Sequence, residues 1–277
     1  MLPIRDNNPT RHFAFVTVGL IAANFLVFLL WQPTFAQGQS AELKQQTFFW
    51  CHALIPYEVT HRTSLAAGGP EAEQVLQEQY GGPGSSEAGR DIQRFLQEKC
   101  PHKSWLESVF VSMFLHAGWL HIGGNMLFLW IFGNNIEDRL RPFLYLLFYL
   151  AGGVAATVLE VALAPNNALP GLGASGAIAA VLGAYLVLYP RARVTTAVIF
   201  FFITLIELPA AVVLGFWFLL QLFSGFGQLG TDVASGGVAY SAHVGGFVFG
   251  LVVGLIVRSW DRRRPAPMFS PRRPDVY

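Results

Sequence analysis

The sequence has few charged residues and very little lysine. Only 13% of its 277 residues are charged, against about 25% in an average soluble domain. All lysines fall between positions 44 and 103. The formal net charge of +1 gives no support for a nucleic-acid partner, and no residue pattern indicates a metal site or a cofactor. Apolar residues, in contrast, make up 53% of the chain, which indicates a membrane protein.

The apolar residues are gathered into six long runs. A straight helix needs about 20 residues to cross a bilayer. The runs approach that length, and the fifth is the shortest. We therefore expect an all-α membrane protein with six transmembrane helices. The runs cover residues 13–31, 111–132, 143–164, 172–189, 209–223 and 240–257.

Arginines mark one side of the membrane. They precede the first run, follow the last, and lie between the second and third runs and between the fourth and fifth. The alternate short loops, 165–171 and 224–239, contain no Lys or Arg. By the positive-inside rule both termini are cytoplasmic, with residues 1–12 before the first helix and 261–277 as a basic tail. We expect a multi-pass protein of the cell membrane, of the bacterial inner-membrane type.

The first run could instead be a signal peptide, because Arg5 and Arg11 precede it and Ala36 follows it. Its length and the lack of a small-x-small cleavage site directly after it favour an uncleaved span at 13–31.

One long hydrophilic segment, residues 32–110, separates the first two runs and is expected outside the membrane. Its middle, residues 66–86, is rich in turn-forming residues, so we expect a mobile excursion, with short helices at 71–80 and 89–98. Cys51 and Cys100 bracket this excursion. They could form a disulfide in an oxidising compartment, or remain two unpaired thiols.

Four polar residues from three runs fall at one depth in the membrane. Counted from the arginine at each cytoplasmic end, Ser175 lies 16 residues above Arg191 and His243 lies 15 above Arg258. His121 and Asn125 lie 18 and 14 residues above Arg139. At a helical rise of about 1.5 Å per residue, all four lie roughly 21 to 27 Å above the cytoplasmic edge.

Each of these residues has a purely structural interpretation when taken alone. A membrane Ser commonly bonds its own backbone, and a His can serve as a proton relay or a helix contact. Asn125, one turn after His121, could act as a packing clamp. Together they supply a nucleophile, a base and oxyanion donors, which an acyl-transfer site requires. Ser175 also follows a loop at a predicted helix start, where free backbone N–H groups can stabilise an oxyanion.

Stripes of small residues offer a way to bring Ser175 and His243 together. One stripe is Gly176, Ala180 and Ala184; the other repeats every four residues, at Ala242, Gly246, Gly250 and Gly254. Small residues let two helix backbones approach closely. The alternative is packing without catalysis.

The ordered motifs of these helices resemble those of the rhomboid family of intramembrane serine proteases. The likeness extends from residue 105 to 260. It rests on His116-x4-His121-x3-Asn125, on Gly173-x-Ser175-Gly176, and on Ala242-His243-x2-Gly246-x3-Gly250. The stretch 133–140 is similar to the family's turn after the second helix.

The resemblance implies a six-helix rhomboid-like bundle, with its second to sixth helices in residues 111–260, and an endopeptidase without a cofactor. Ser175 and His243 would form a dyad without an acid, with His121, Asn125 and the Ser175 backbone at the oxyanion hole and His116 near the mouth. Substrates would be transmembrane proteins cut near the outer face. The supporting residues expected to hold His243 by packing are Tyr185, Gly246 and Gly250.

Two acidic residues and two rival functions remain open from the sequence. Pro209 favours a helix start there, which leaves 194–207 at the cytoplasmic interface and Glu207 near a helix N-terminus. A helix from Val194 would bury Glu207 and favour a transporter. Glu160 is expected to be solvated at the outer end of the third helix. A catalytically silent rhomboid relative that binds membrane proteins is the other rival.

Overall fold

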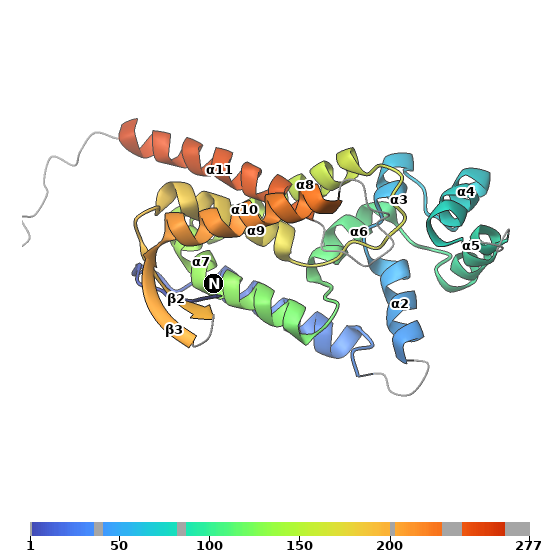
Figure 1. Cartoon of the computed structure of the whole chain (residues 1–277), viewed down its shortest axis with the longest axis horizontal. Helices are drawn as coiled ribbons and strands as arrows, with labels where there is room; N and C mark the ends of the chain where they lie inside the picture. The colour runs from blue at the N-terminus through green and yellow to red at the C-terminus, as the bar shows by residue number, and fades with distance from the viewer. Residues whose placement is uncertain (1, 36–40, 82–86, 200–202, 229–239, 264–277) are drawn as a thin grey trace, which may run out of the picture.

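The computed structural model describes residues 2–35, 41–81, 87–199, 203–228 and 240–263. It is a helical bundle with a helical layer at one end and a small sheet at the other (Figure 1). The bundle helices are α1 (Phe15–Leu26, continued by the π-turn η1, Val27–Trp31), α7 (Trp119–Leu140), α8 (Pro142–Leu163), α9 (Ser175–Leu188), α10 (Ala210–Gln228) and α11 (Tyr240–Arg263). The helical layer contains α2 (Ala41–His52), α3 (Pro56–His61), α4 (Gly69–Tyr80), α5 (Ala88–Lys99), α6 (Trp105–Val111) and the 3-10 turn η2 (Ser112–Phe114).

Helix α9 forms the centre of the bundle. Every residue from Gly176 to Tyr185 is buried, and α7, α8, α10 and α11 all pack around the helix. A helix that is apolar on all sides is stable only when other helices or lipid surround it. The helical class predicted from the sequence is therefore confirmed.

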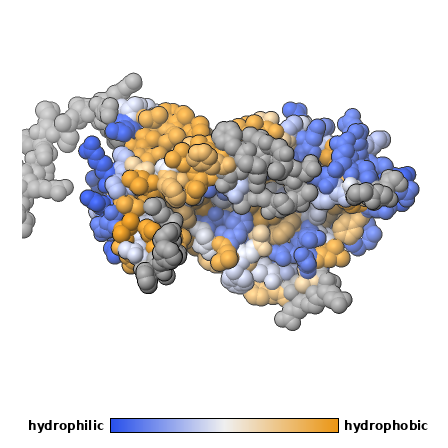
Figure 2. All heavy atoms as spheres, viewed as in Figure 1, coloured by the Kyte–Doolittle hydropathy of each residue, from blue (hydrophilic) through white to orange (hydrophobic). Residues whose placement is uncertain are grey.

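Hydrophobic side chains cover the outside of the bundle. Figure 2 shows a hydrophobic surface over the bundle and hydrophilic surface toward the layer with α4 and α5. Two described helices are long and apolar enough to cross a membrane, Pro142–Leu163 and Tyr240–Trp260. Shorter apolar helices lie beside them, at Phe15–Trp31, Trp105–Phe114, Ser175–Leu188 and Ala210–Phe223. This distribution fits a membrane protein. Apolar side chains exposed in this way are stable against lipid tails, whereas their exposure to water is unfavourable.

The second helix begins later than its apolar run. Residues 111–114 belong to α6 and η2, the chain is extended at Leu115, and α7 starts only at Trp119. Both backbone groups of His116 are bonded by the Gln32 side chain, which holds the break in place. Residues 133–140 are consequently the last turns of α7 and not a turn that follows it.

The C-terminal turns of α7 hold the first helix. The buried carboxylate of Glu137 accepts hydrogen bonds from the backbone N–H groups of Val16 and Thr17 and from the Thr17 hydroxyl. These are first-turn groups of α1 that have no partner inside their own helix. Glu137 therefore caps α1 from a position 120 residues further along the chain.

Close packing of α9 on α11 matches the predicted small-residue stripes. A Cβ added at Gly246 would overlap the carbonyl oxygen of Gly176, and one at Gly250 would overlap that of Ala180. At Gly183 it would overlap the carbonyl oxygen of Phe247. The two backbones are thus in direct contact along the stripe, as such motifs allow.

The sheet contains β1 (Leu2–Asp6), β2 (Arg193–Ile199) and β3 (Ile203–Pro209), antiparallel in that order. Of the segment 194–207, expected at the interface, residues 194–199 belong to β2 and residues 203–207 to β3, which agrees with their many β-branched side chains. Pro209 ends β3, and α10 begins at Ala210. Glu207 is exposed and accepts a hydrogen bond from Asn7 at 2.9 Å. The buried Glu207 that would have favoured a transporter is therefore absent from the fold.

The N-terminal segment joins the sheet to the bundle. The Asp6 carboxylate accepts hydrogen bonds from the Tyr185 hydroxyl and the Asn135 amide, both at 2.7 Å. Tyr185 was expected to hold His243 by packing, but its ring contacts Phe132 and Tyr189 instead. It lies almost three turns along α9 from Ser175. The expected role of Tyr185 beside His243 is therefore wrong.

The hydrophilic segment between the first two apolar runs forms the compact helical layer, called the outer layer below, where we expected a mobile excursion. Helices α4 and α5 match the two predicted short helices, and residues 82–86 of the turn-rich stretch lie outside the described residues. Cys51 and Cys100 are joined as a disulfide. A separate core fills the layer, made of Ile55, Tyr57, Leu65, Ala66, Ala72, Leu76, Leu96, Cys100 and Ala168.

A buried ion pair lies in the same layer. The Lys103 ammonium is 2.7 Å from the Glu58 carboxylate, and both side chains are almost fully buried. Glu58 also accepts the N–H of Leu65 at 2.9 Å. Burial raises the pKa of Glu58, and the charge of Lys103 only partly offsets this.

The predicted basic tail beyond residue 263 lies outside the described residues.

Gly250→Ala is expected to lower the thermal stability, because its methyl group would collide with the Ala180 carbonyl. Overpacking of this kind costs about 1–3 kcal/mol. Gly19→Ala is the matched control, since a methyl group there meets nothing within 4 Å. Thermal unfolding in detergent measures both variants, and equal melting temperatures would contradict direct backbone contact between α9 and α11.

Lys103→Met is expected to destabilise the outer layer in a pH-dependent way. Removing one partner of a buried pair costs about 3–5 kcal/mol. Without its cation, the folded-state pKa of Glu58 lies even further above its unfolded value. Protonation then favours the fold, so the stability of the variant is greatest at acidic pH and falls as pH rises through the folded-state pKa.

Thermal unfolding from acidic to neutral pH measures this effect. The double variant Glu58→Gln, Lys103→Met removes the titrating group and should show a flatter profile than Lys103→Met. If the melting temperatures of Lys103→Met and of the wild type differ by the same amount at every pH, the lost ion pair is not the cause of the destabilisation.

Candidate active site

Ser175 and His243 are in hydrogen-bond contact. Ser175 is the first residue of α9, and His243 lies in the first turn of α11. The distance from His243 Nε2 to Ser175 Oγ is 2.7 Å. Gly246, one turn after His243, lies against the Gly176 carbonyl, so the short serine side chain spans the gap between the helices. The structure thus brings together the pair that the depth count selected.

Gln221 contacts the other nitrogen of the His243 ring. Its Oε1 atom lies 2.6 Å from His243 Nδ1. The sequence interpretation missed this residue, because a single glutamine inside the apolar run of α10 carries no period or motif. The Trp217 ring, one turn earlier on α10, lies 5.9 Å from the imidazole. His243 is therefore held by an amide and an aromatic ring of α10.

His121 lies beside the turn that precedes Ser175. Its Nδ1 accepts the backbone N–H of Ala117 at 3.3 Å. A neutral imidazole bonded in this way carries its proton on Nε2. A Cβ added at Gly173 would come within 2.9 Å of His121 Nε2, and Gly173 has a φ of +126°. Glycine at 173 thus provides both the backbone conformation and the space for an N–H donor next to the serine.

Asn125 and His116 lie near this donor with unused polar atoms. Asn125 follows His121 by one turn on α7, and its Nδ2 atom is buried with no partner in the described part of the chain. His116 was expected near the mouth, but it is fully buried, with its ring 5.0 Å from that of His121. Gln32, which the sequence interpretation also missed, bonds both backbone groups of His116.

A small cavity lies behind the serine. Its volume is about 40 Å³, and its lining includes Ser175, Ser112, Thr157 and Glu160. A cavity of this size has room for at least one water molecule. Glu160 was expected to be solvated, but it is buried on α8 next to Gly171. The described structure therefore places a carboxyl group in the wall of the cavity.

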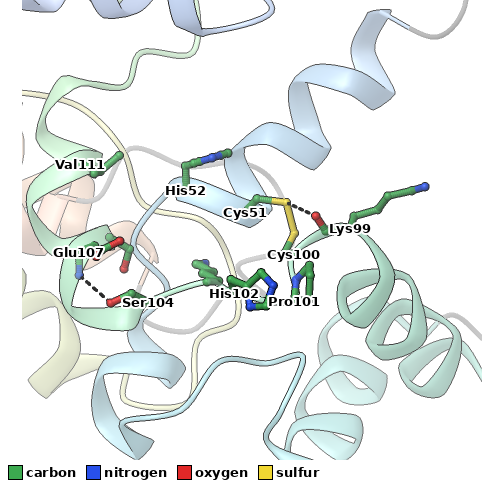
Figure 3. A pocket seen from close by; sticks show the side chains of 11 residues that line it. Cys51, His52, Lys99, Cys100, Pro101, His102, Ser104, Glu107 and Val111 are labelled. Carbon is green, nitrogen blue, oxygen red and sulfur yellow. Dashed lines mark hydrogen bonds between the residues drawn. A yellow bond between two sulfur atoms is a disulfide. The ribbon is translucent and has the colours of Figure 1, made fainter.

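A larger cavity, of about 360 Å³, lies in the outer layer (Figure 3). It is lined by the disulfide and by polar groups that include His52, His102 and Glu107. None of the predicted site residues except the two cysteines lines it. The described residues contain no group of three or more His, Cys, Asp or Glu side chains placed to hold a metal ion. The Ser175 region is therefore the stronger candidate for chemistry.

Fold and site together define a helical membrane protein with a half-buried serine at the end of its central helix in contact with a buried histidine. The rhomboid domain model matches residues 103–260, which is more than half of the chain. The chain therefore belongs to the rhomboid family.

Three relatives show what kinds of protein it resembles. Rhomboid protein 1, mitochondrial, of Saccharomyces cerevisiae is 27% identical over 172 residues, covering 61% of this chain and 46% of the relative. Presenilin-associated rhomboid-like protein, mitochondrial, of Homo sapiens is 31% identical over 113 residues, covering 40% and 29%. Rhomboid protease GluP of Bacillus subtilis is 39% identical over 72 residues, covering 26% and 14%. The chain matches less than half the length of each.

Proposed function

We propose that the chain is an intramembrane serine endopeptidase. The observation that carries this proposal is the 2.7 Å contact between His243 Nε2 and Ser175 Oγ. A serine hydroxyl is a weak nucleophile unless a base within hydrogen-bond reach accepts its proton. A catalytically silent relative would not need this contact, so the silent alternative is less well supported.

The reaction follows from the geometry of the pair. His243 Nε2 takes the proton of Ser175 as Oγ attacks the carbonyl carbon of a peptide bond. The tetrahedral intermediate collapses when His243 protonates the departing amine, which leaves an acyl group on Ser175. Water then attacks this ester, with His243 accepting its proton and returning it to Ser175. The cavity lined by Glu160 and Thr157 is a candidate store for that water.

The oxyanion of the intermediate would lie between three donors. The backbone N–H of Ser175 is at the first position of α9, where helix N–H groups have no intrahelical partner. The Nε2–H of His121 and the unpaired Nδ2 of Asn125 supply the side-chain donors. Preorganised donors in a water-poor site contribute about 10²–10³-fold each to such reactions.

The position of the site supports substrates that are transmembrane helices cut near one face. Ser175 follows a loop that pairs with the outer layer through Leu54 and Gly171 and through Ser112 and Gly173. Six membrane crossings with both termini in the cytoplasm, in the cell membrane, are the topology that the arginine distribution favours. The outer layer would then stand above the bilayer, where the Cys51–Cys100 disulfide is stable.

Ser175→Ala and His243→Ala are expected to abolish labelling by a serine-directed fluorophosphonate. Loss of either member of such a pair lowers the rate by about 10³-fold or more. The experiment uses the purified full chain in detergent and records labelling by in-gel fluorescence. Ser108→Ala is the matched control, because the buried Ser108 hydroxyl only bonds its own helix, at Trp105. Undiminished labelling of Ser175→Ala would contradict the proposal.

A further inference from the structure

Gln221 of α10 is the polar partner of His243 on the side away from Ser175. We propose that Gln221 is a positioning residue, which orients His243 through its Nδ1 atom only while α10 is packed against α11. This inference rests on the proposed Ser175–His243 function. It assigns a role to Gln221, a residue that belongs to none of the sequence motifs.

The chemistry of the imidazole requires an acceptor at Nδ1. To take the Ser175 proton, Nε2 must present its lone pair, so the neutral ring must carry its hydrogen on Nδ1. The Gln221 Oε1 atom, 2.6 Å from Nδ1, accepts that hydrogen. After proton transfer the ring is a cation with two N–H donors, and the same carbonyl oxygen still accepts one of them. The glutamine therefore selects the reactive tautomer and also stabilises the charged form.

The contacts of α10 explain why Gln221 points at the histidine. Phe218 stacks on Phe247 of α11 with ring centroids 4.3 Å apart, and Trp217 lies 6.0 Å from the same ring. Gln221 follows Trp217 by four residues and thus lies on the same side of α10. The opposite face is exposed, at Val212, Phe216, Leu219, Leu220 and Phe223. Helix α10 is therefore attached to the bundle along one narrow face that includes Gln221.

The start of α10 is anchored by backbone hydrogen bonds. At its start, the N–H groups of Ala210 and Ala211 donate to the carbonyls of Ala192 and Pro190 at 2.8 and 3.1 Å. Gln221 lies 11 residues beyond Ala210, or about 16 Å along the helix axis. An outward tilt of α10 about its anchored start would therefore move Gln221 further than any residue near the anchor. The orientation of His243 therefore depends on a part of α10 that lies well away from this anchor.

The consequence is a link between the packing of α10 and the chemistry of the dyad. When α10 separates from α11, His243 loses the acceptor on Nδ1. When α10 returns, Phe218 and Gln221 come back into place together. The base is then fully oriented only in the closed bundle.

The test compares three substitutions of Gln221 in the full chain. Gln221→Glu keeps an oxygen acceptor at the same reach, Gln221→Met keeps the length without an acceptor, and Gln221→Asn withdraws the acceptor by one bond. Leu220→Ala, on the exposed face of α10, is the control. Melting temperatures verify that each variant is folded, and Gln221→Asn tests the inference even if Gln221→Met does not fold.

The first measurement is independent of activity. Nitrogen NMR of ¹⁵N-histidine-labelled protein in detergent reports which ring nitrogen carries the hydrogen, and the His243→Ala spectrum assigns the His243 signals. We expect the hydrogen on Nδ1 in the wild type, Leu220→Ala and Gln221→Glu, and a mixture of tautomers in Gln221→Met and Gln221→Asn. Wild-type signals in both of these last variants would overturn the inference.

The second measurement is the rate of fluorophosphonate labelling. We expect Gln221→Met and Gln221→Asn to be slower by about 10- to 100-fold, the usual effect of losing a group that orients a functional side chain. Gln221→Glu should recover most of this loss. If Gln221→Glu is as slow as Gln221→Met while the wild type labels normally, the acceptor role is wrong. If the wild type itself is not labelled, the proposed function fails, and the NMR result still decides the role of Gln221.

Discussion

The direct backbone contact between α9 and α11 is the constraint on which the rest of the structure depends. Two packed helices ordinarily lie about 8–10 Å apart between axes, and small residues let them approach more closely than larger side chains would. Glycines at 246 and 250 place α11 against the carbonyl groups of α9, and the gap from Ser175 to His243 closes to 2.7 Å. Because backbones and not flexible side chains make this contact, the spacing of the two helices that carry the pair is set by the helices themselves.

Buried polar side chains fasten the two ends of the bundle around that contact. At the outer end, Gln32 bonds both backbone groups of His116 and so fixes the chain break before α7. At the other end, Glu137 caps α1, and Asp6 joins the N-terminal strand to Tyr185 of α9. An unpaired polar group is costly in an apolar surrounding, so each of these contacts strongly favours one arrangement. These contacts frame the helix that carries Ser175.

Helix α10 differs from this frame. It packs against the bundle along one face and exposes large apolar side chains on the other. Trp217 and Gln221 lie on that contact face, and both contact His243. Ser175 is therefore held by the centre of the bundle, whereas His243 also contacts a helix at the edge of the bundle.

The sequence by itself determined the apolar helices, the small-residue stripes and the Ser175–His243 pair, because spacing along a helix converts directly into depth and facing side. It could not supply Gln221, the Asp6–Tyr185 bond or the break before α7. Those depend on which residues meet after packing, and Asp6 and Tyr185 are 179 positions apart. A lone glutamine in an apolar run has no period, and strand β1 forms only when its partner β2 is present. Local patterns encode burial and periodicity, whereas hydrogen bonds between distant segments are decided only by the tertiary structure.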